Sequence, residues 1–320
     1  MTLWGYTMMC EQSDPCSLVD DVVRAEAVGF DFAVISDHYF PWLDSQGHSP
    51  YAWSVLGAAA QATSSIPLMT YVTCPSFRYH PAVVAQKAAT VQLLSGGRFT
   101  LGLGSGENLN EHVIGQGWPN SRVRHERLRE AIDVIRALFA GGFVDYRGDH
   151  FDVNRAKLWD LPSPVPPIGV AVSGPRSARL AGDKADLMIA VQPEPTLGEM
   201  FDRAGGVGKP RVGQMAVSFD TDAQAAVERA HDQFRWFASG WHVMSELPST
   251  TAFAAASAQV SAEDVRAQIA CGPDVEEHVG KLQAFVDAGF SHVALVQIGG
   301  GHQAPFLEWA GRELLPALRS

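Results

Sequence analysis

Residues 66–104 read IPLMTYVTCPSFRYHPAVVAQKAATVQLLSGGRFTLGLG, and this stretch decides the fold class. Two apolar runs, 66–73 and 98–104, flank a helix-like segment at 81–95 that begins with Pro81. Apolar runs that do not alternate with polar residues are typical of parallel strands covered on both faces. Proline is favoured at the first position of a helix. The stretch therefore predicts two parallel strands joined by a helix.

The same pattern repeats along nearly the whole chain. Further strand-like runs lie at 4–9, 31–35, 168–172, 186–191, 212–218 and 292–298. Further helix-like segments lie at 16–28, 50–61, 121–140, 176–184, 222–238, 274–288 and 303–318. Eight strands alternating with helices predict one (β/α)8 TIM barrel, a single domain over residues 1–320. A doubly wound sheet is disfavoured because no GxGxxG fingerprint follows the first strand.

The sequence also predicts two insertions in the barrel and two helices that end at glycine. Residues 141–166 contain FVDYRGDHF, which predicts a small hairpin with the turn at Arg-Gly-Asp. Residues 236–262 are rich in Ala, Ser and Thr with bulky Trp236, Trp241 and Met244, which predicts a helical lid or loop. The glycines of Ala27-Val28-Gly29-Phe30 and Ala288-Gly289-Phe290 predict helix ends.

The composition and charge of the chain indicate which partners and which cellular location to expect. Hydrophobic residues make up 46% and charged residues 18%, which excludes a disordered chain. The net charge of -11 argues against nucleic-acid or anionic-membrane partners, because both require a basic face. No stretch approaches the length of a membrane span, and the N-terminus MTLWGY lacks the pattern of a signal peptide. We therefore expect a cytoplasmic protein.

The cysteines and lysines give two further indications, one about metal sites and one about the source genome. The four cysteines show no CxxC and no ligand spacing with histidine, so we expect free thiols and no metal site. Of the 24 basic residues only Lys87, Lys157, Lys184, Lys209 and Lys281 are lysines. Low lysine with abundant alanine and glycine suggests a GC-rich bacterial genome.

Candidate catalytic residues follow the predicted strands, where the active site of such a barrel lies. Asp37 and His38 follow the second strand, and histidine is suited to proton transfer near neutral pH. Glu107 follows the fourth strand after a glycine turn. Ser173-Gly174-Pro175-Arg176-Ser177 follows the fifth strand and opens a helix, whose N-terminus is suited to an anion. Each segment alone also fits a structural role: a satisfied histidine, a helix cap or an ordinary turn.

Four segments together resemble a known family. SDHYFPW (36–42), YVTCPSFRYHPAVVAQ (71–86), GRFTLGLGSGENLNE (97–111) and AVSGPRSARLAG (171–182) are similar to the bacterial luciferase-type barrel superfamily. They most resemble its coenzyme F420-dependent branch around the actinobacterial F420-dependent glucose-6-phosphate dehydrogenases. The resemblance covers nearly the entire chain, and it implies F420 as the cofactor and a homodimer as the assembly.

The resemblance also assigns roles to residues. It implies that His38 handles the substrate hydroxyl proton, that Glu107 exchanges a proton with the deazaflavin ring, and that Trp42 lies beside the reacting centre. Tyr71-Val72 falls where the family has a non-prolyl cis peptide behind the ring. The implied cofactor-binding positions are Asp37, Tyr71, Val72, Cys74, Ser105, Gly106, Asn110, Ser173, Gly174, Arg176 and Ser177.

The chain departs from this pattern where the sugar-phosphate enzymes bind phosphate with two lysines and an arginine. At the first lysine position it reads Val191-Gln192-Pro193-Glu194, no lysine occurs in 210–280, and Gln268 is the best match for the arginine. We therefore predict a non-phosphorylated alcohol, ketone or enone as the substrate, contacted by Val191, Gln192 and Trp241. The alternatives are an FMN-dependent luciferase-like monooxygenase, an F420-dependent sugar-phosphate dehydrogenase and a non-catalytic flavin-binding protein.

Overall fold

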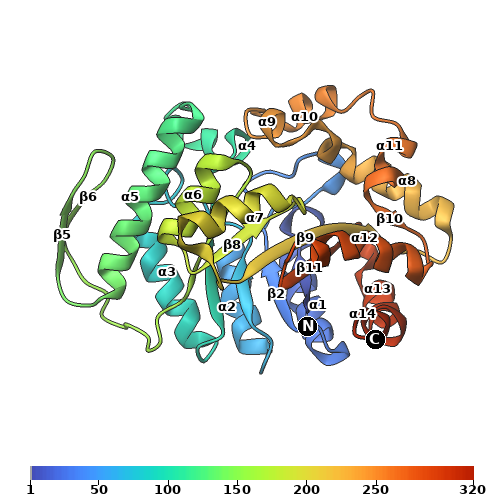
Figure 1. Cartoon of the computed structure of the whole chain (residues 1–320), viewed down its shortest axis with the longest axis horizontal. Helices are drawn as coiled ribbons and strands as arrows, with labels where there is room; N and C mark the ends of the chain where they lie inside the picture. The colour runs from blue at the N-terminus through green and yellow to red at the C-terminus, as the bar shows by residue number, and fades with distance from the viewer. Residues whose placement is uncertain (1) are drawn as a thin grey trace.

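The computed structural model describes residues 2–320, and eight parallel strands form a closed barrel at its centre (Figure 1). The strands are β1 (Leu3–Met8), β2 (Phe32–Ile35), β3 (Leu68–Thr70), β4 (Phe99–Leu103), β7 (Ile168–Ala171), β8 (Leu187–Ala190), β9 (Arg211–Ser218) and β11 (His292–Gln297). Each pairs with the next in this order, and β11 returns to β1 with Trp4 opposite Val293. The predicted (β/α)8 barrel is confirmed.

Helices surround the barrel and connect its strands. They are α1 (Pro15–Val28), α2 (Ala52–Ala62), α3 (Pro81–Leu94), α5 (Ser121–Phe139), α6 (Pro175–Lys184), α7 (Pro195–Phe201), α8 (Ala223–Phe234), α12 (Val275–Asp287), α13 (Gln303–Trp309) and α14 (Leu315–Leu318). The sequence pattern predicted no helix between β8 and β9, where the structure has α7. At seven residues α7 is too short to show a clear apolar period.

Glycines end α1 and α12 as expected. Gly29 and Gly289 have φ of +96° and +79°, a conformation that side chains with a Cβ rarely adopt. Phe30 and Phe290 then turn back into the buried core beside the barrel. Both helix ends are therefore determined by a local glycine signal.

The buried apolar side chains form three clusters. The largest cluster lies between the strands and the helices and includes Met215 and Phe285. A small cluster with Phe32, Met69 and Val212 fills the inside of the barrel. A third cluster joins the carboxyl ends of the strands to the segment after α8. None of the helices within residues 2–320 has the length and apolar character needed to cross a membrane.

Both predicted insertions are present. β5 (Val144–Arg147) and β6 (Asp152–Ala156) form an antiparallel hairpin that projects beside α5 (Figure 1). The predicted helix 222–238 ends at Phe234, because a 3-10 turn (Arg235–Ser239) follows. Beyond it come α9 (Trp241–Met244), α10 (Thr250–Ala256) and α11 (Ala262–Gln268). Figure 1 shows α9 and α10 at the end of the barrel opposite the two chain termini.

A two-residue strand, β10 (Ala270–Cys271), was not predicted from the sequence. β9 pairs with β11 along its length, so β8 and β10 share its other edge. β8 pairs with residues 211–213 of β9, and β10 pairs with Val217 and Ser218. The edge of β9 is thus interrupted at residues 214–216.

Candidate active site

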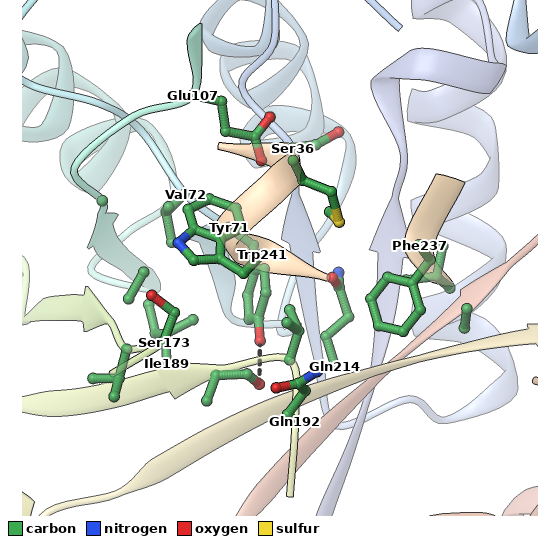
Figure 2. Close-up of a pocket in the computed structure, with 18 of the residues that line it drawn as sticks. Ser36, Tyr71, Val72, Glu107, Ser173, Ile189, Gln192, Gln214, Phe237 and Trp241 are labelled. Atoms are coloured by element: carbon green, nitrogen blue, oxygen red, sulfur yellow. Dashed lines mark hydrogen bonds between the residues drawn. The ribbon is translucent and has the colours of Figure 1, made fainter. Parts of the chain in front are cut away.

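A cavity of about 520 Å³ opens at the carboxyl ends of the strands. Its walls come from the segments after β1, β2, β3, β4, β7 and β8, from β9, and from the helical segment 234–244. Figure 2 shows Glu107 at one end of the cavity and Gln192 and Gln214 at the other, with Trp241 between them. The position agrees with the rule that barrel active sites lie at the carboxyl ends of strands.

His38 is held at the buried end of the cavity by a carboxylate from the neighbouring strand. Its Nδ1 lies 2.8 Å from Glu11 Oε1, and Glu11 is fully buried just after β1. The other Glu11 oxygen accepts a hydrogen bond from the Ser36 hydroxyl at 2.7 Å. Burial lowers the pKa of His38, but the Glu11 carboxylate outweighs burial and holds it above its ordinary value. Glu11 thus directs Nδ1 away from the cavity and stabilises the imidazolium form.

Glu107 faces the other ring nitrogen of His38. Its Oε2 lies 3.9 Å from His38 Nε2 and accepts a hydrogen bond from the Asn110 side chain at 3.3 Å. Burial raises the pKa of Glu107, and the nearby His38 only partly offsets it. Asn110 also accepts hydrogen bonds from the backbone of Tyr39 and Phe40, so it ties the β2 loop to the β4 loop. The cavity therefore holds two adjacent titratable groups, an imidazole and a carboxyl, of the kinds that act in general acid–base catalysis.

Trp42 joins this pair to the helical segment after α8. Its ring packs edge-on against His38 with centroids 4.4 Å apart. On its other side it stacks on Trp236, with centroids 4.0 Å apart and planes 12° apart. Trp236 is buried among Phe234, Phe237 and other aromatic rings. The segment after α8 thus packs Trp42 against His38, the candidate catalytic residue.

Asp37 lies in a buried ionic network behind the same wall. Its carboxylate accepts hydrogen bonds from the Trp53 indole and the Thr73 hydroxyl. The Arg78 guanidinium lies 3.4 Å from Asp37 Oδ1 and 3.1 Å from Glu111 Oε1. Removing one member of such a buried network leaves an unpaired charge and costs about 3–5 kcal/mol. The network fixes the loops after β2, β3 and β4 against one another.

A non-prolyl cis peptide joins Tyr71 to Val72, as the resemblance implied. The strand β3 ends one residue earlier, at Thr70. The Tyr71 hydroxyl donates a hydrogen bond to the Ala190 carbonyl at 2.9 Å across the barrel, which Figure 2 draws as a dashed line. Beside this wall, a Cβ at Gly106 would lie 2.8 Å from Cys74 Sγ, so no larger residue fits there without a shift.

Comparison with known proteins places the chain in a family. The sequence profile described as luciferase-like monooxygenase matches residues 5–292. The chain belongs to the luciferase-like monooxygenase family. It is 34% identical to an F420-dependent glucose-6-phosphate dehydrogenase of Nakamurella multipartita, over 99% of this chain and 96% of that protein. It is 39% identical to an F420-dependent hydroxymycolic acid dehydrogenase of Mycobacterium tuberculosis, over 89% of this chain and 80% of that protein.

A solved structure has the same architecture. It is an F420-dependent secondary alcohol dehydrogenase in complex with an F420-acetone adduct. It superposes with a TM-score of 0.90 at 29% identity and covers 100% of this chain and 99% of its own. The predicted membership of the luciferase-like family is confirmed.

The fold brings nearly all of the predicted site residues of this luciferase-like chain to one cavity. The residues that line it are His38, Trp42 and Glu107; Asp37, Tyr71, Val72, Cys74, Ser105, Gly106, Asn110, Ser173 and Ser177; and Val191, Gln192 and Trp241. Gly174 and Arg176 do not line it, and Arg176 is exposed. The roles assigned to all of these residues remain predictions.

The turn from 173 to 177 differs in detail from the expectation. The Ser177 hydroxyl accepts hydrogen bonds from the backbone N–H groups of Ser173 and Gly174 and donates to the Gly174 carbonyl. That hydroxyl is therefore used inside the turn rather than offered to a ligand. The first backbone N–H groups of α6, at Arg176 and Ser177, remain directed out of the helix end.

Glu11, Arg78 and Gln214 are site residues that the sequence analysis missed. Glu11 follows β1 as Asp37 and Glu107 follow their strands, so its place after a strand was an available signal. Gln214 lies inside β9, where its amide donates to the Thr7 hydroxyl across the barrel, and no sequence signal marks it. Among residues 2–320, no group of three or more His, Cys, Asp or Glu side chains could hold a metal ion.

Proposed function

We propose that this protein is a coenzyme F420-dependent oxidoreductase that moves hydride between the deazaflavin and a non-phosphorylated alcohol, ketone or enone. The observation that carries the proposal is His38, held between Glu11 and Glu107 at one end of a cavity whose opposite wall carries Gln192 and Gln268. The F420-dependent relatives at 34% and 39% identity support the cofactor.

The residues of the cavity suit a flat deazaflavin ring with a phosphate-bearing tail. Val72 and Ile189 offer apolar surface for a ring face. Ser105 and Asn110 offer polar groups at a ring edge, near the buried Glu107. The N-terminal turn of α6 offers the backbone donors that a phosphate requires. When bound, the deazaflavin would accept or supply the hydride.

The protein's own groups handle the protons. His38 accepts the substrate hydroxyl proton at Nε2, while Glu11 stabilises the positive charge that the ring then carries. Burial raises the pKa of Glu107, which favours its protonated form beside that nitrogen. Trp42 keeps the imidazole from rotating, because it packs against one side of the ring. In the reverse direction His38 returns the proton to the carbonyl oxygen.

The neutral wall of the cavity supports a substrate without phosphate. Gln192 and Gln268, which stand near two positions where the sugar-phosphate enzymes have cations, both line it. Lys281 also lines it, but its ammonium donates to the carbonyls of Arg266 and Ile269 at the end of α11. At these positions no cation is available to pair with a phosphodianion. A bound phosphate would therefore lose its hydration without gaining an ion pair.

The direct test compares two substrates with oxidised F420. We expect reduction of the cofactor with a secondary alcohol such as 2-butanol and negligible turnover of glucose 6-phosphate. Efficient turnover of glucose 6-phosphate would refute the proposed substrate class. Tight binding of FMN with oxygen consumption, visible in the absorption spectrum of the purified protein, would refute the cofactor.

A further inference from the structure

The cavity does not end inside the barrel but continues through its wall at β9. Residues 214–216 of β9 have no strand partner on the edge shared by β8 and β10, among the residues that the structure describes. In a parallel strand alternate side chains face opposite sides. Gln214 and Ala216 therefore face the barrel interior, whereas Met215 faces the helices. All three nevertheless line the same cavity, so the space passes through the interrupted edge.

Beyond the gap the cavity becomes a groove between α7 and the pair α11–α12. Leu197, Met215, Ile269 and Phe285 line it with buried apolar side chains. Ala267 on α11 and Ala284 on α12 line its outer part, and both are exposed. We call this the β9 groove. It gives an elongated ligand a continuous path from His38 to the protein surface.

The chemistry of the β9 groove favours an uncharged, apolar occupant. Its floor is aliphatic and aromatic, and Gln192 and Gln268 at its rim carry no charge. The Lys281 ammonium is bound by two carbonyl oxygens and lies 3.9 Å from Glu277 Oε1, so its charge is compensated within the protein. Apolar surface buried along such a path stabilises binding in proportion to its length. Polar or anionic substituents would lose hydration there without gaining a partner.

We propose that the β9 groove binds the alkyl chain of the substrate, which makes the substrates secondary alcohols or methyl ketones with a long aliphatic substituent. This inference rests on the proposed function, which places the reacting carbon beside His38. The chain then leaves the barrel between β8 and β10 and runs toward Ala284.

The first experiment measures binding without the cofactor. Methyl ketones from 2-butanone to 2-decanone are titrated into the protein, and the fluorescence of the cavity tryptophans, Trp42, Trp236 and Trp241, reports binding. We expect the Kd to fall about fourfold for each methylene that enters the groove, from roughly 0.8 kcal/mol per buried CH2. The same Kd across the series would overturn the inference.

A blocking variant and a matched control locate the effect. Ala284→Trp places a bulky ring at the outer end of the groove. Gln283→Trp adds the same ring to the adjacent exposed position of α12, which does not line the cavity. We expect Ala284→Trp to weaken 2-decanone binding at least tenfold and to leave 2-butanone binding unchanged, whereas Gln283→Trp changes neither. Equal 2-decanone binding by the two variants would overturn the inference.

Turnover separates this inference from the proposed function. The same ketones are offered with reduced F420, and kcat/KM is measured for each. A rise with chain length supports both statements. Chain-length-dependent binding without any turnover refutes the proposed function and leaves the groove as a binding site. Turnover that is equal for all chain lengths supports the proposed function and refutes the alkyl-chain site.

Discussion

The two walls of the cavity differ in how their polar groups are satisfied. The wall after β1, β2 and β4 holds Glu11, Asp37 and Glu111, each at most 2% exposed and each bound to other protein groups. The wall formed by β8, β9 and α11 holds exposed Gln192 and Gln268 over an apolar floor. The first can be called the catalytic wall and the second the substrate wall.

This difference indicates which wall can accept substitutions without loss of stability. A buried charge must keep its partners, because losing one leaves the other desolvated and unpaired. An exposed glutamine can be replaced with little effect on folding, since surface substitutions usually change stability by less than about 0.5 kcal/mol. We therefore expect changes in the catalytic wall to reduce rate for every substrate, and changes in the substrate wall to alter which substrate is used.

The largest effect is expected from His38→Ala. Loss of the proton acceptor should lower kcat by about 10²–10⁴-fold for all alcohols, because this is the usual contribution of a general base. F420 binding, followed by fluorescence titration, should change by less than about threefold. Wild-type turnover in this variant would remove His38 from the mechanism.

A smaller effect is expected from Glu11→Gln, which removes the carboxylate that raises the pKa of His38. With burial left as the main influence, that pKa should fall. Because alcohol oxidation needs the neutral ring, the acidic limb of the pH profile of kcat/KM should move to lower pH. At neutral pH kcat should drop about tenfold, because the imidazolium loses the negative charge beside Nδ1.

The matched control for Glu11→Gln is Glu26→Gln. Glu26 accepts hydrogen bonds from the backbone of Ser64, Ser65 and Ile66 on the surface. Burial raises the pKa of Glu26, but the hydrogen bonds together outweigh burial and lower that pKa to about 2. Its loss should reduce the melting temperature and leave the pH profile unchanged. An identical pH profile for wild type and Glu11→Gln would contradict the positioning role of Glu11.

The substrate wall should accept new charges. The double variant Gln192→Lys with Gln268→Arg should lower the Kd of glucose 6-phosphate, followed by tryptophan fluorescence, about tenfold, through a gain of about 1.4 kcal/mol from two cations near one phosphate. Its melting temperature should stay within about 2 °C of wild type, as expected for exposed positions. Gln283→Lys adds a cation outside the cavity, and an equal gain there would show that the wall is not responsible.

The smallest effect is expected at the Trp42–Trp236 stack, where the segment after α8 packs against the catalytic wall. Trp236→Leu should lower kcat about three- to tenfold, since aromatic pairs contribute about 0.5–1.5 kcal/mol beyond burial. Trp309→Leu removes a comparable stack with Phe219, whose ring centroids are 4.3 Å apart, away from the cavity. Both variants should melt at lower temperature. Equal kcat in the two would show that the stack does not position Trp42.

Much of this site could be predicted because barrel topology turns chain order into position. Once eight parallel strands are recognised, residues that follow them must gather at one end, as His38, Glu107 and Ser173 do. The helix α7 and the strand β10 were not predictable in this way. Each is too short to carry a period, and both form because neighbouring elements supply partners.

The sequence by itself determined the barrel, the helix stops at Gly29 and Gly289, and the end of the barrel where the chemistry lies. These depend on residue periodicity and on backbone conformations that are local to a few residues. Only the tertiary structure decided that Glu11 meets His38, that Trp236 stacks on Trp42, and that the edge of β9 shared by β8 and β10 is interrupted at residues 214–216. Those outcomes depend on contacts between elements far apart in the chain, which form only when the barrel closes.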